Sequence, residues 1–339
     1  MADYKAIKGL TIQTVSGDPP SPLLGQMWYN STTGKLRSGV SQAAAWATGG
    51  LLTNRRYSMM GAGDKTAGLG FGGYFVPSVR AFTEKYDGSS WTEVGDMNTA
   101  RMRGAGFGTD TAAVGVGGQA PAITNVAEEW NGASWTTVTS IPSPTSVSLN
   151  LGGSGTQTSG LVMGGGAAPA NTNVTSEYDG SSWTAGGNLN LTRGGLCGTG
   201  TQTASLAMGG NYTPPPGVAM TADAEDYNGT AWTEIGDMSV ARGIAGGGGG
   251  PAGAITFGGE SPPAPSGVKT SDVYDGSSWA AGADLPGVVN RISGAAFAVG
   301  NTLGYGGYRY LGSPSPSDVM QESWEYSDVT TVGSNITTS

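Results

Sequence analysis

The feature that most constrains this chain is a six-residue phrase that recurs along it. The phrase reads aromatic, Asp or Asn, Gly, two small residues and Trp, and it stands at 86–91, 130–135, 178–183, 227–232 and 274–279. Its successive final Trp residues lie 44 to 49 positions apart, and Trp46 lies 45 positions before Trp91. Such a period is typical of arrays in which each repeat forms one supersecondary unit. The chain is therefore expected to be an array of similar units.

A Gly-Gly pair provides a second marker in the same register. The pairs stand at 72–73, 117–118, 164–165, 209–210, 258–259 and 306–307. The distance from each Trp to the next pair is 26 positions in four units, and 27 and 29 in the other two. Two markers that recur at nearly constant spacing from one another predict six units.

Each unit is expected to contain four antiparallel strands. An Asp-Gly or Asn-Gly dipeptide between aromatic segments is a strong signal for a tight hairpin. A run of small residues such as 104–107, followed by a turn and a second run that ends at the Gly pair, predicts another hairpin. Glycine suits strands that approach one another closely, because no side chain stands between them.

With these markers the chain resembles the kelch family of β-propellers. That repeat has an Arg opening its first strand, a di-glycine after the second, an aromatic ending the third and a Trp on the fourth. Arg56, Arg101, Arg193 and Arg242 stand 16 positions before the Gly pair, and Arg291 stands 15 before it. The resemblance implies an all-β fold, a six-bladed kelch-like propeller of four-stranded blades, and it says little about activity.

The ends of the array suggest how the last blade is completed. The sixth unit runs through Trp324 and Tyr326 without a final Trp, and Trp46 has the correct spacing to supply the missing outer strand. The competing strand is 329–332. We favour Trp46, and we divide the chain into an arm at 1–40, a propeller at 41–330 and a tail at 331–339.

Composition excludes several classes of function. The chain has no His and one cysteine, Cys197, so it can build neither a histidine-dependent catalytic site nor an intrachain disulfide. Its net charge is −9 with no basic run, which disfavours nucleic acid and anionic membranes as partners. Neither a secretory signal nor an apolar segment of about 18 residues is present, so we expect no membrane insertion. No cofactor and no metal are expected.

The loops after the Gly pairs differ between units, whereas the Asp-Gly turns are nearly identical. Variable loops on a rigid scaffold often carry binding. We expect contacts to sugars or apolar protein surfaces from the aromatic loop residues Tyr74, Tyr212, Tyr308 and Tyr310.

The five arginines have two possible roles. They could form an anion-recognising ring, as related propellers use this position for acidic ligands, or each could pair with a carboxylate of its own unit. The third unit has Ser148 at the Arg position and Ser176 where other units carry Glu84, Glu128, Glu225, Asp272 or Glu322. Because Arg and acid are lost together there, we favour structural pairing. Acids that recur in this way look like scaffold and not like catalysts.

The N-terminal segment lies outside the repeats. Residues 16–22 have the composition of a linker, and 26–36 read as an aromatic hairpin with a Ser-Thr-Thr-Gly turn. Together with the propeller units, this hairpin resembles structural and fibre proteins of tailed bacteriophages. The resemblance implies attachment to other virion proteins through Trp28 and Tyr29, and a homo-oligomeric or larger assembly.

The sequence therefore predicts a non-enzymatic virion protein, in the fibre, tail or capsid decoration, that presents one face to a host surface glycan or a neighbouring virion protein. It would be made in the host cytoplasm and released by lysis. The alternative is an intracellular interaction module that binds an acidic peptide through the arginines. A glycan hydrolase is the third possibility.

Overall fold

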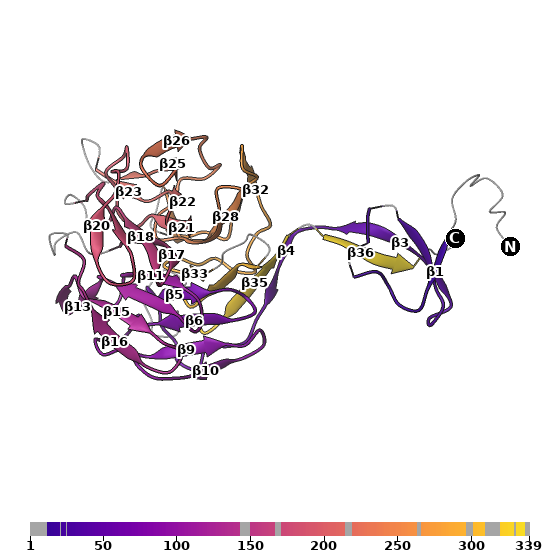
Figure 1. Cartoon of the computed structure of the whole chain (residues 1–339), viewed down its shortest axis with the longest axis horizontal. Coiled ribbons are helices and arrows are strands. Elements are labelled where there is room, and N and C mark those ends of the chain that lie inside the picture. Colours follow the sequence, from indigo (N-terminus) through magenta and orange to yellow (C-terminus); the bar gives the residue numbers. More distant parts are fainter. Residues whose placement is uncertain are drawn as a thin grey trace. The chain divides into compact units, whose positions relative to one another are not determined.

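The computed structural model shows an all-β protein (Figure 1). It describes residues 12–20, 22–24, 26–142, 150–166, 171–213, 219–262, 266–295, 301–308, 319–328 and 330–335. Within these ranges there is no α-helix, and hence none long and apolar enough to cross a membrane.

The chain forms two compact units. The larger spans Trp46–Tyr326, and the smaller combines Met1–Ala45 with Ser327–Ser339. The boundaries expected at 40 and 330 therefore move to 45 and 326. The segment expected to be a tail at 331–339 contributes a strand to the smaller unit.

The larger unit contains, in its described part, six four-stranded antiparallel sheets in a propeller-like arrangement. In five of them the four strands follow in chain order, as the repeats predict. These sheets are β5 (Met60–Gly63), β6 (Gly68–Phe71), β9 (Thr83–Tyr86), β10 (Trp91–Glu93); β11 (Ala105–Gly108), β12 (Ala113–Val116), β15 (Ala127–Trp130), β16 (Trp135–Val138); β17 (Gly152–Thr156), β18 (Ser159–Met163), β19 (Thr175–Tyr178), β20 (Trp183–Ala185); β21 (Cys197–Thr201), β22 (Ala204–Met208), β25 (Ala224–Tyr227), β26 (Trp232–Ile235); β27 (Gly246–Gly250), β28 (Gly253–Phe257), β31 (Ser271–Tyr274), β32 (Trp279–Ala281).

The sixth sheet takes its strands from both ends of the unit. Its order is β33 (Ser293–Ala295), β34 (Leu303–Tyr305), β35 (Ser323–Ser327), β4 (Ala45–Thr48). The strand that carries Trp46 thus fills the outer position, as predicted, and the Trp46 indole lies 5.2 Å from the Tyr326 ring between centroids. The competing assignment of this position to 329–332 is wrong.

The first strands of neighbouring sheets pack closely against one another. Contacts run from β5 to β11, β17, β21, β27 and β33 in turn, and β33 also contacts β5. A Cβ placed on Gly106 would lie 2.6 Å from the backbone N and O of Gly61 in the neighbouring sheet. This lack of space accounts for the glycine-rich first strands.

The outer aromatic residues join neighbouring sheets. The Trp135 indole N–H donates to Thr83 Oγ1 at 2.9 Å, and Trp232 donates to Thr175 Oγ1 at the same distance. The Tyr227 hydroxyl donates to Glu177 Oε1 of the preceding sheet at 2.6 Å. Four of the five recurring phrases therefore supply both a tight turn and a polar contact to a neighbouring sheet, whereas the Trp279 indole N–H of the fifth has no partner among the described residues.

Within the described ranges, four of the variable loops form short hairpins beyond the Gly pairs. Their strands are β7 (Tyr74–Phe75), β8 (Ser78–Val79), β13 (Gln119–Ala120), β14 (Ala122–Ile123), β23 (Asn211–Tyr212), β24 (Ala219–Met220), β29 (Glu260–Ser261), β30 (Ser266–Gly267). Among the described residues, single antiparallel bridges tie the segment before five of the first strands to the residues after a Gly pair, for example Met102 to Gln119 and Asn290 to Tyr308. We call the edge of the sheets that carries them the loop edge.

The smaller unit is one four-stranded sheet in the order β1 (Gln13–Val15), β2 (Met27–Asn30), β3 (Lys35–Gln42), β36 (Thr330–Asn335). The predicted aromatic hairpin is β2–β3, with its turn at 31–34. Asp18, expected in a linker, instead accepts hydrogen bonds from Trp28 and Asn30 and pairs with Arg37 at 3.0 Å. These contacts hold the segment around Asp18 against the sheet.

Candidate functional site

Four of the five predicted arginines are buried and paired with the recurring acids. Arg56, Arg101, Arg193 and Arg242 are at most 1% exposed. Their carboxylate partners are, respectively, Glu84, Glu128, Glu225 and Asp272. Each of these arginines precedes the first strand of its sheet and reaches an acid on the third strand.

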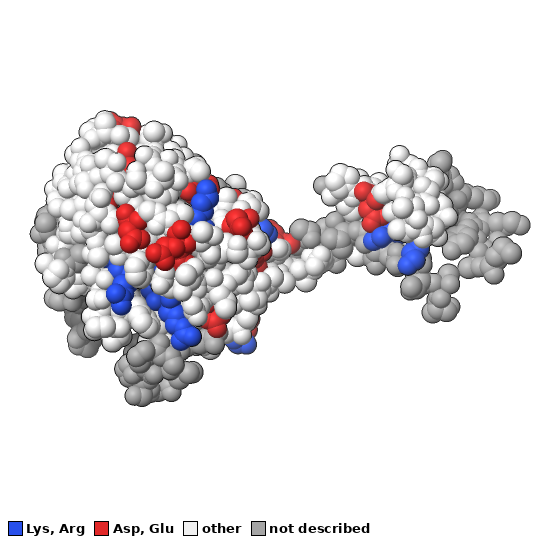
Figure 2. Space-filling model, turned by 90° about the horizontal axis from the view of Figure 1, so that it is seen from below, with Lys and Arg blue, Asp and Glu red and all other residues white. Residues whose placement is uncertain are grey.

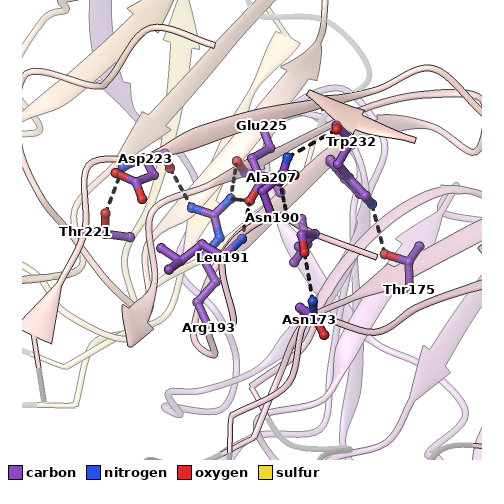
Figure 3. Close-up of polar contacts among 11 residues, drawn as sticks. Asn173, Thr175, Asn190, Leu191, Arg193, Ala207, Thr221, Asp223, Glu225 and Trp232 are labelled. Atoms are coloured by element: carbon purple, nitrogen blue, oxygen red, sulfur yellow. Dashed lines mark hydrogen bonds and ion pairs between the residues drawn. The ribbon is translucent and has the colours of Figure 1, made fainter. Parts of the chain in front are cut away.

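The Arg193 site illustrates the arrangement (Figure 3). Its guanidinium bonds to Glu225 Oε1 at 3.0 Å and to the carbonyl oxygens of Asp223 and Ala207 at 2.8 and 3.2 Å. Burial lowers the pKa of Arg193, and the Glu225 charge opposes that shift. Because Arg193 is fully buried and both its Nη groups bond to internal acceptors, this guanidinium is not presented to a ligand.

The same acid also fixes the loop that precedes the arginine. Glu225 accepts hydrogen bonds from the backbone N–H groups of Asn190 and Leu191 at 2.7 and 3.3 Å. Glu128 does the same for Asn98 and Thr99 at 2.7 and 3.2 Å. Each recurring carboxylate thus balances one buried cation and satisfies two loop donors, which is a structural role.

The register of the sixth unit differs from the one read in the sequence. The bridge at Asn290 corresponds to that at Met102, so Val289 stands at the position of Arg101, and Arg291 corresponds to Arg103. In the third strand, Gly304 pairs with Trp324, as Gly115 pairs with Glu128. Trp324, and not Glu322, therefore occupies the acid position.

The sixth unit has consequently lost both members of the pair, like the third. Val289 and Trp324, the residues in their place, are 0% and 2% exposed. In the third unit Ser176 is buried, and Ser148 lies outside the described residues. Joint replacement by apolar residues accords with the physics of buried ion pairs, in which loss of one partner costs far more than loss of both.

The residues equivalent to Arg103 in the six units stand two positions before the first strand of each sheet. They are Ser58, Arg103, Asn150, Gly195, Ile244, Arg291, and all have a φ between 51° and 65°. Five backbone hydrogen bonds of 2.7 to 3.2 Å link these residues, and in each the N–H of one residue donates to the carbonyl oxygen of the next. They run from Ile244 to Gly195, from Gly195 to Asn150, from Asn150 to Arg103, from Arg103 to Ser58, and from Ser58 to Arg291. These bonds, rather than local preference, hold non-glycine residues in the left-handed region.

A pocket of about 110 Å³ opens beside these six residues. Side chains of Ser58, Arg103, Asn150 and Arg291 line it, and the first strands form its wall. We call it the central pocket. It lies next to the loop edge, because the residues just before Ser58 and Arg103 bridge to the loop residues Tyr74 and Gln119.

The central pocket contains donors that the protein does not satisfy. Within the described residues, no carboxylate pairs with Arg103, and its buried Nε has no acceptor. The Ser58 hydroxyl, in a residue 5% exposed, also has no partner. Arg291 differs, since its Nε bonds to Glu260 Oε1 at 3.1 Å. Burial, together with the nearby Arg291 charge, lowers the pKa of Arg103.

Two of the four predicted tyrosines pack against Tyr57, which directly precedes the pocket residue Ser58. Tyr74 and Tyr308 each contact Tyr57, with ring centroids 5.5 and 5.4 Å apart, and Arg291 lies over the Tyr57 ring at 6.0 Å. We call these three residues the tyrosine cluster. Tyr212 stands half-buried on β23, and Tyr310 lies outside the described residues.

The two predicted attachment residues have different surroundings. Trp28 is fully buried and bonded to Asp18, so it supports the smaller unit. Tyr29 is 39% exposed and is the one whose ring reaches solvent.

The remaining groups that could carry out chemistry, the Cys197 thiol and candidate metal ligands, lie in surroundings that do not favour it. Burial raises the pKa of the Cys197 thiol to about 12, which disfavours the reactive thiolate. The described part of the chain holds no group of three His, Cys, Asp or Glu side chains that could bind a metal. On the face seen in Figure 2, neutral residues cover most of the larger unit, and the charged residues form small groups of both signs.

The sequence analysis missed Arg103 and Tyr57. Arg103 has no counterpart of its own type at the equivalent position in most units, so a search for recurring residues passed over it. The one signal was the spacing of Arg291, which is 15 instead of 16 positions from its Gly pair.

Comparison with known proteins adds no assignment. The chain matches no model of a protein family, and no curated protein matches it at a significant level.

Proposed function

We propose that the six sheets are the blades of a closed, six-bladed kelch-like propeller. Support comes from the contact of β33 with β5 and from the Trp91 indole, which donates to Ser323 Oγ of the sixth sheet at 3.2 Å. The Tyr86 hydroxyl likewise bonds to Glu325. An experimental structure with an open arrangement of the sheets, or with another number of blades, would overturn this proposal.

We further propose that the protein is a non-enzymatic virion component of a bacteriophage. In this proposal the N-terminal arm attaches to other virion proteins, and the loop edge meets a host surface glycan or a neighbouring virion protein. The observation that carries the binding role is a contrast in carboxylate partners. The four buried recurring arginines each pair with an acid, whereas Arg103 beside the loop edge pairs with none among the described residues. The virion assignment rests on the resemblance of the aromatic hairpin and the repeats.

The other two functions find less support. A ring of five arginines for an acidic peptide would need guanidiniums that reach solvent, and four of the five are buried. For a glycan hydrolase, the recurring carboxylates are the obvious candidates. They are occupied by arginines and loop amides.

Co-sedimentation tests the virion proposal. Phage particles from a lysate of the producing culture would be purified by density gradient and analysed by mass spectrometry and antibody labelling. We expect the chain at a constant ratio to the capsid protein. Recovery only from the soluble fraction, bound to a cellular protein, would favour the interaction module instead.

A further inference from the structure

The charges around the central pocket leave one cation unbalanced. Arg103 and Arg291 both line the pocket, and Glu260 bonds to Arg291. The described groups therefore sum to one positive charge, carried by Arg103. A half-buried charge without a counter-ion is costly, and a bound anion removes that cost. A ligand with a single negative charge fits this balance.

The Ser58 hydroxyl independently indicates an acceptor in the pocket. This hydroxyl is buried and has no partner among the described residues, and Ser58 is one of the residues that line the pocket. Buried hydroxyls in proteins are normally bonded. A carboxylate can accept from a guanidinium and from a hydroxyl at once, because it has two oxygens with several lone pairs.

The size of the pocket and the aromatic residues near it restrict the class of ligand further. A volume of about 110 Å³ is smaller than the roughly 150 Å³ cavity that accepts benzene, so the pocket takes a carboxylate and a few attached atoms. Arg291, which lines the pocket, lies over the Tyr57 ring of the tyrosine cluster. Tyrosine faces and hydroxyls suit a polar ring with apolar C–H faces, which is the surface of a sugar.

We propose that the central pocket binds the carboxylate of an acidic sugar, such as a uronic acid unit of a glycan, through Arg103 and Ser58, while the tyrosine cluster contacts the sugar ring. This inference rests on the proposed binding role of the loop edge. It names the ligand class for that role.

Calorimetric titration of the full chain tests it with four probes. These are glucuronic acid, glucose as the neutral analogue, acetate as the bare carboxylate, and an acetylated di-glutamate peptide. We expect glucuronic acid to bind at least tenfold more tightly than glucose or acetate, and more tightly than the peptide. Equal binding of glucose would overturn the carboxylate role. Preference for the peptide would assign the pocket to an acidic protein segment.

Variants then locate the site. Arg103→Met should weaken glucuronic acid binding at least tenfold, and Arg103→Lys should weaken it less, because lysine keeps the charge but loses the planar fork. Tyr57→Ala should reduce the preference for glucuronic acid over acetate. Arg55→Met is the control, since Arg55 is exposed and does not line the pocket. Full binding by the Arg103→Met protein would overturn the assignment.

The two proposals can fail separately. If no carboxylate binds the unmodified protein but the chain co-sediments with particles, the pocket assignment is wrong and the virion role stands. If glucuronic acid binds but the chain does not co-sediment with particles, the virion role is wrong and the pocket assignment stands.

Discussion

Arg101 and Arg103 are two residues apart in one segment, yet their surroundings differ sharply. Arg101 is fully buried and pairs with Glu128 at 3.0 Å. Arg103 lines the central pocket and has no carboxylate partner among the described residues. The first position carries arginine in four units, whereas the residue at the second changes from unit to unit. In this array, repetition marks groups that hold the scaffold together, and departures from repetition mark groups open to other uses.

The largest expected effect follows from breaking a recurring pair. Arg101→Met leaves the buried Glu128 without its cation and should lower the free energy of unfolding by about 3–5 kcal/mol. Equilibrium unfolding in urea measures this change. The double variant Arg101→Met, Glu128→Leu resembles the sixth unit and should lose less than the sum of the two single changes. Additive losses would show that the pair is not coupled.

A smaller effect is expected from the recurring contacts between sheets. Tyr227→Phe removes the hydrogen bond to Glu177 and should cost roughly 1.5–3 kcal/mol, as for bonds to charged groups. Tyr212→Phe, at a varied loop position, is the control and should change stability by less than about 0.5 kcal/mol. Similar losses of stability in the two variants would contradict the expectation that recurring positions stabilise the fold more than varied ones.

The same tyrosine predicts a dependence on alkaline pH. Burial and the bond to Glu177 raise the pKa of Tyr227 to about 12, above the value of about 10 in an unfolded chain. The folded state therefore favours the neutral phenol. Its contribution is complete below about pH 10 and is lost as the pH rises through about 12. Urea unfolding across this range should show a smaller loss for Tyr227→Phe than for the unmodified protein.

The Asp-Gly turns should contribute a small pH dependence of stability, and only at acidic pH. Asp87 accepts hydrogen bonds from the N–H groups of Ser89 and Ser90, and these lower its pKa to about 2. Its contribution is present above about pH 4 and is lost as the pH falls through about 2. Asp87→Asn should change stability little at pH 7, because Asn131 and Asn228 make equivalent bonds. Thermal melts at pH 7 and pH 2.5 measure both effects.

The smallest stability effect is expected at Arg103, which makes the sharpest contrast with Arg101. Arg103→Met removes a cation that has no partner, so unfolding free energy should change by less than about 0.5 kcal/mol or rise slightly. Thermal melting of the Arg101→Met and Arg103→Met proteins side by side measures the contrast. Equal destabilisation would mean that Arg103 is part of the scaffold.

Much of the fold was predictable because its constraints are local and repeated. The Asp-Gly turns, the Gly pairs and the spacing of Trp46 each fix a position in a unit, and together they gave the sheets and the source of the last outer strand. The pairing of β36 with β3 could not be predicted in this way. It joins residues at opposite ends of the chain, and no pattern outside the repeats signals it.

The candidate site was predicted only in part. Tyr74 and Tyr308 were found from their loops, but Arg291 was assigned to the wrong position. Val289, the counterpart of Arg101, stands 17 instead of 16 positions before its Gly pair, so the extra residue hid the true register and Arg291 lies two positions beyond it. The sequence also could not predict whether Arg103 has a carboxylate partner. Whether a guanidinium has a partner depends on which carboxylates the folded chain brings near it, and the sequence does not state that.

The sixth sheet has a consequence for the time course of folding. Its outer strand, β4, ends at Thr48, and its partner β35 begins at Ser323. On a ribosome that adds about 5–20 residues per second, β4 therefore waits roughly 14–55 seconds before its partner has been made. Such distant pairings are typical of slow folding, because a long loop must close before any contact compensates for its entropy. Until β35 has been made, the nascent chain exposes an unpaired strand edge on either side of the gap, and this interval is when it is most open to pairing with a second copy of itself.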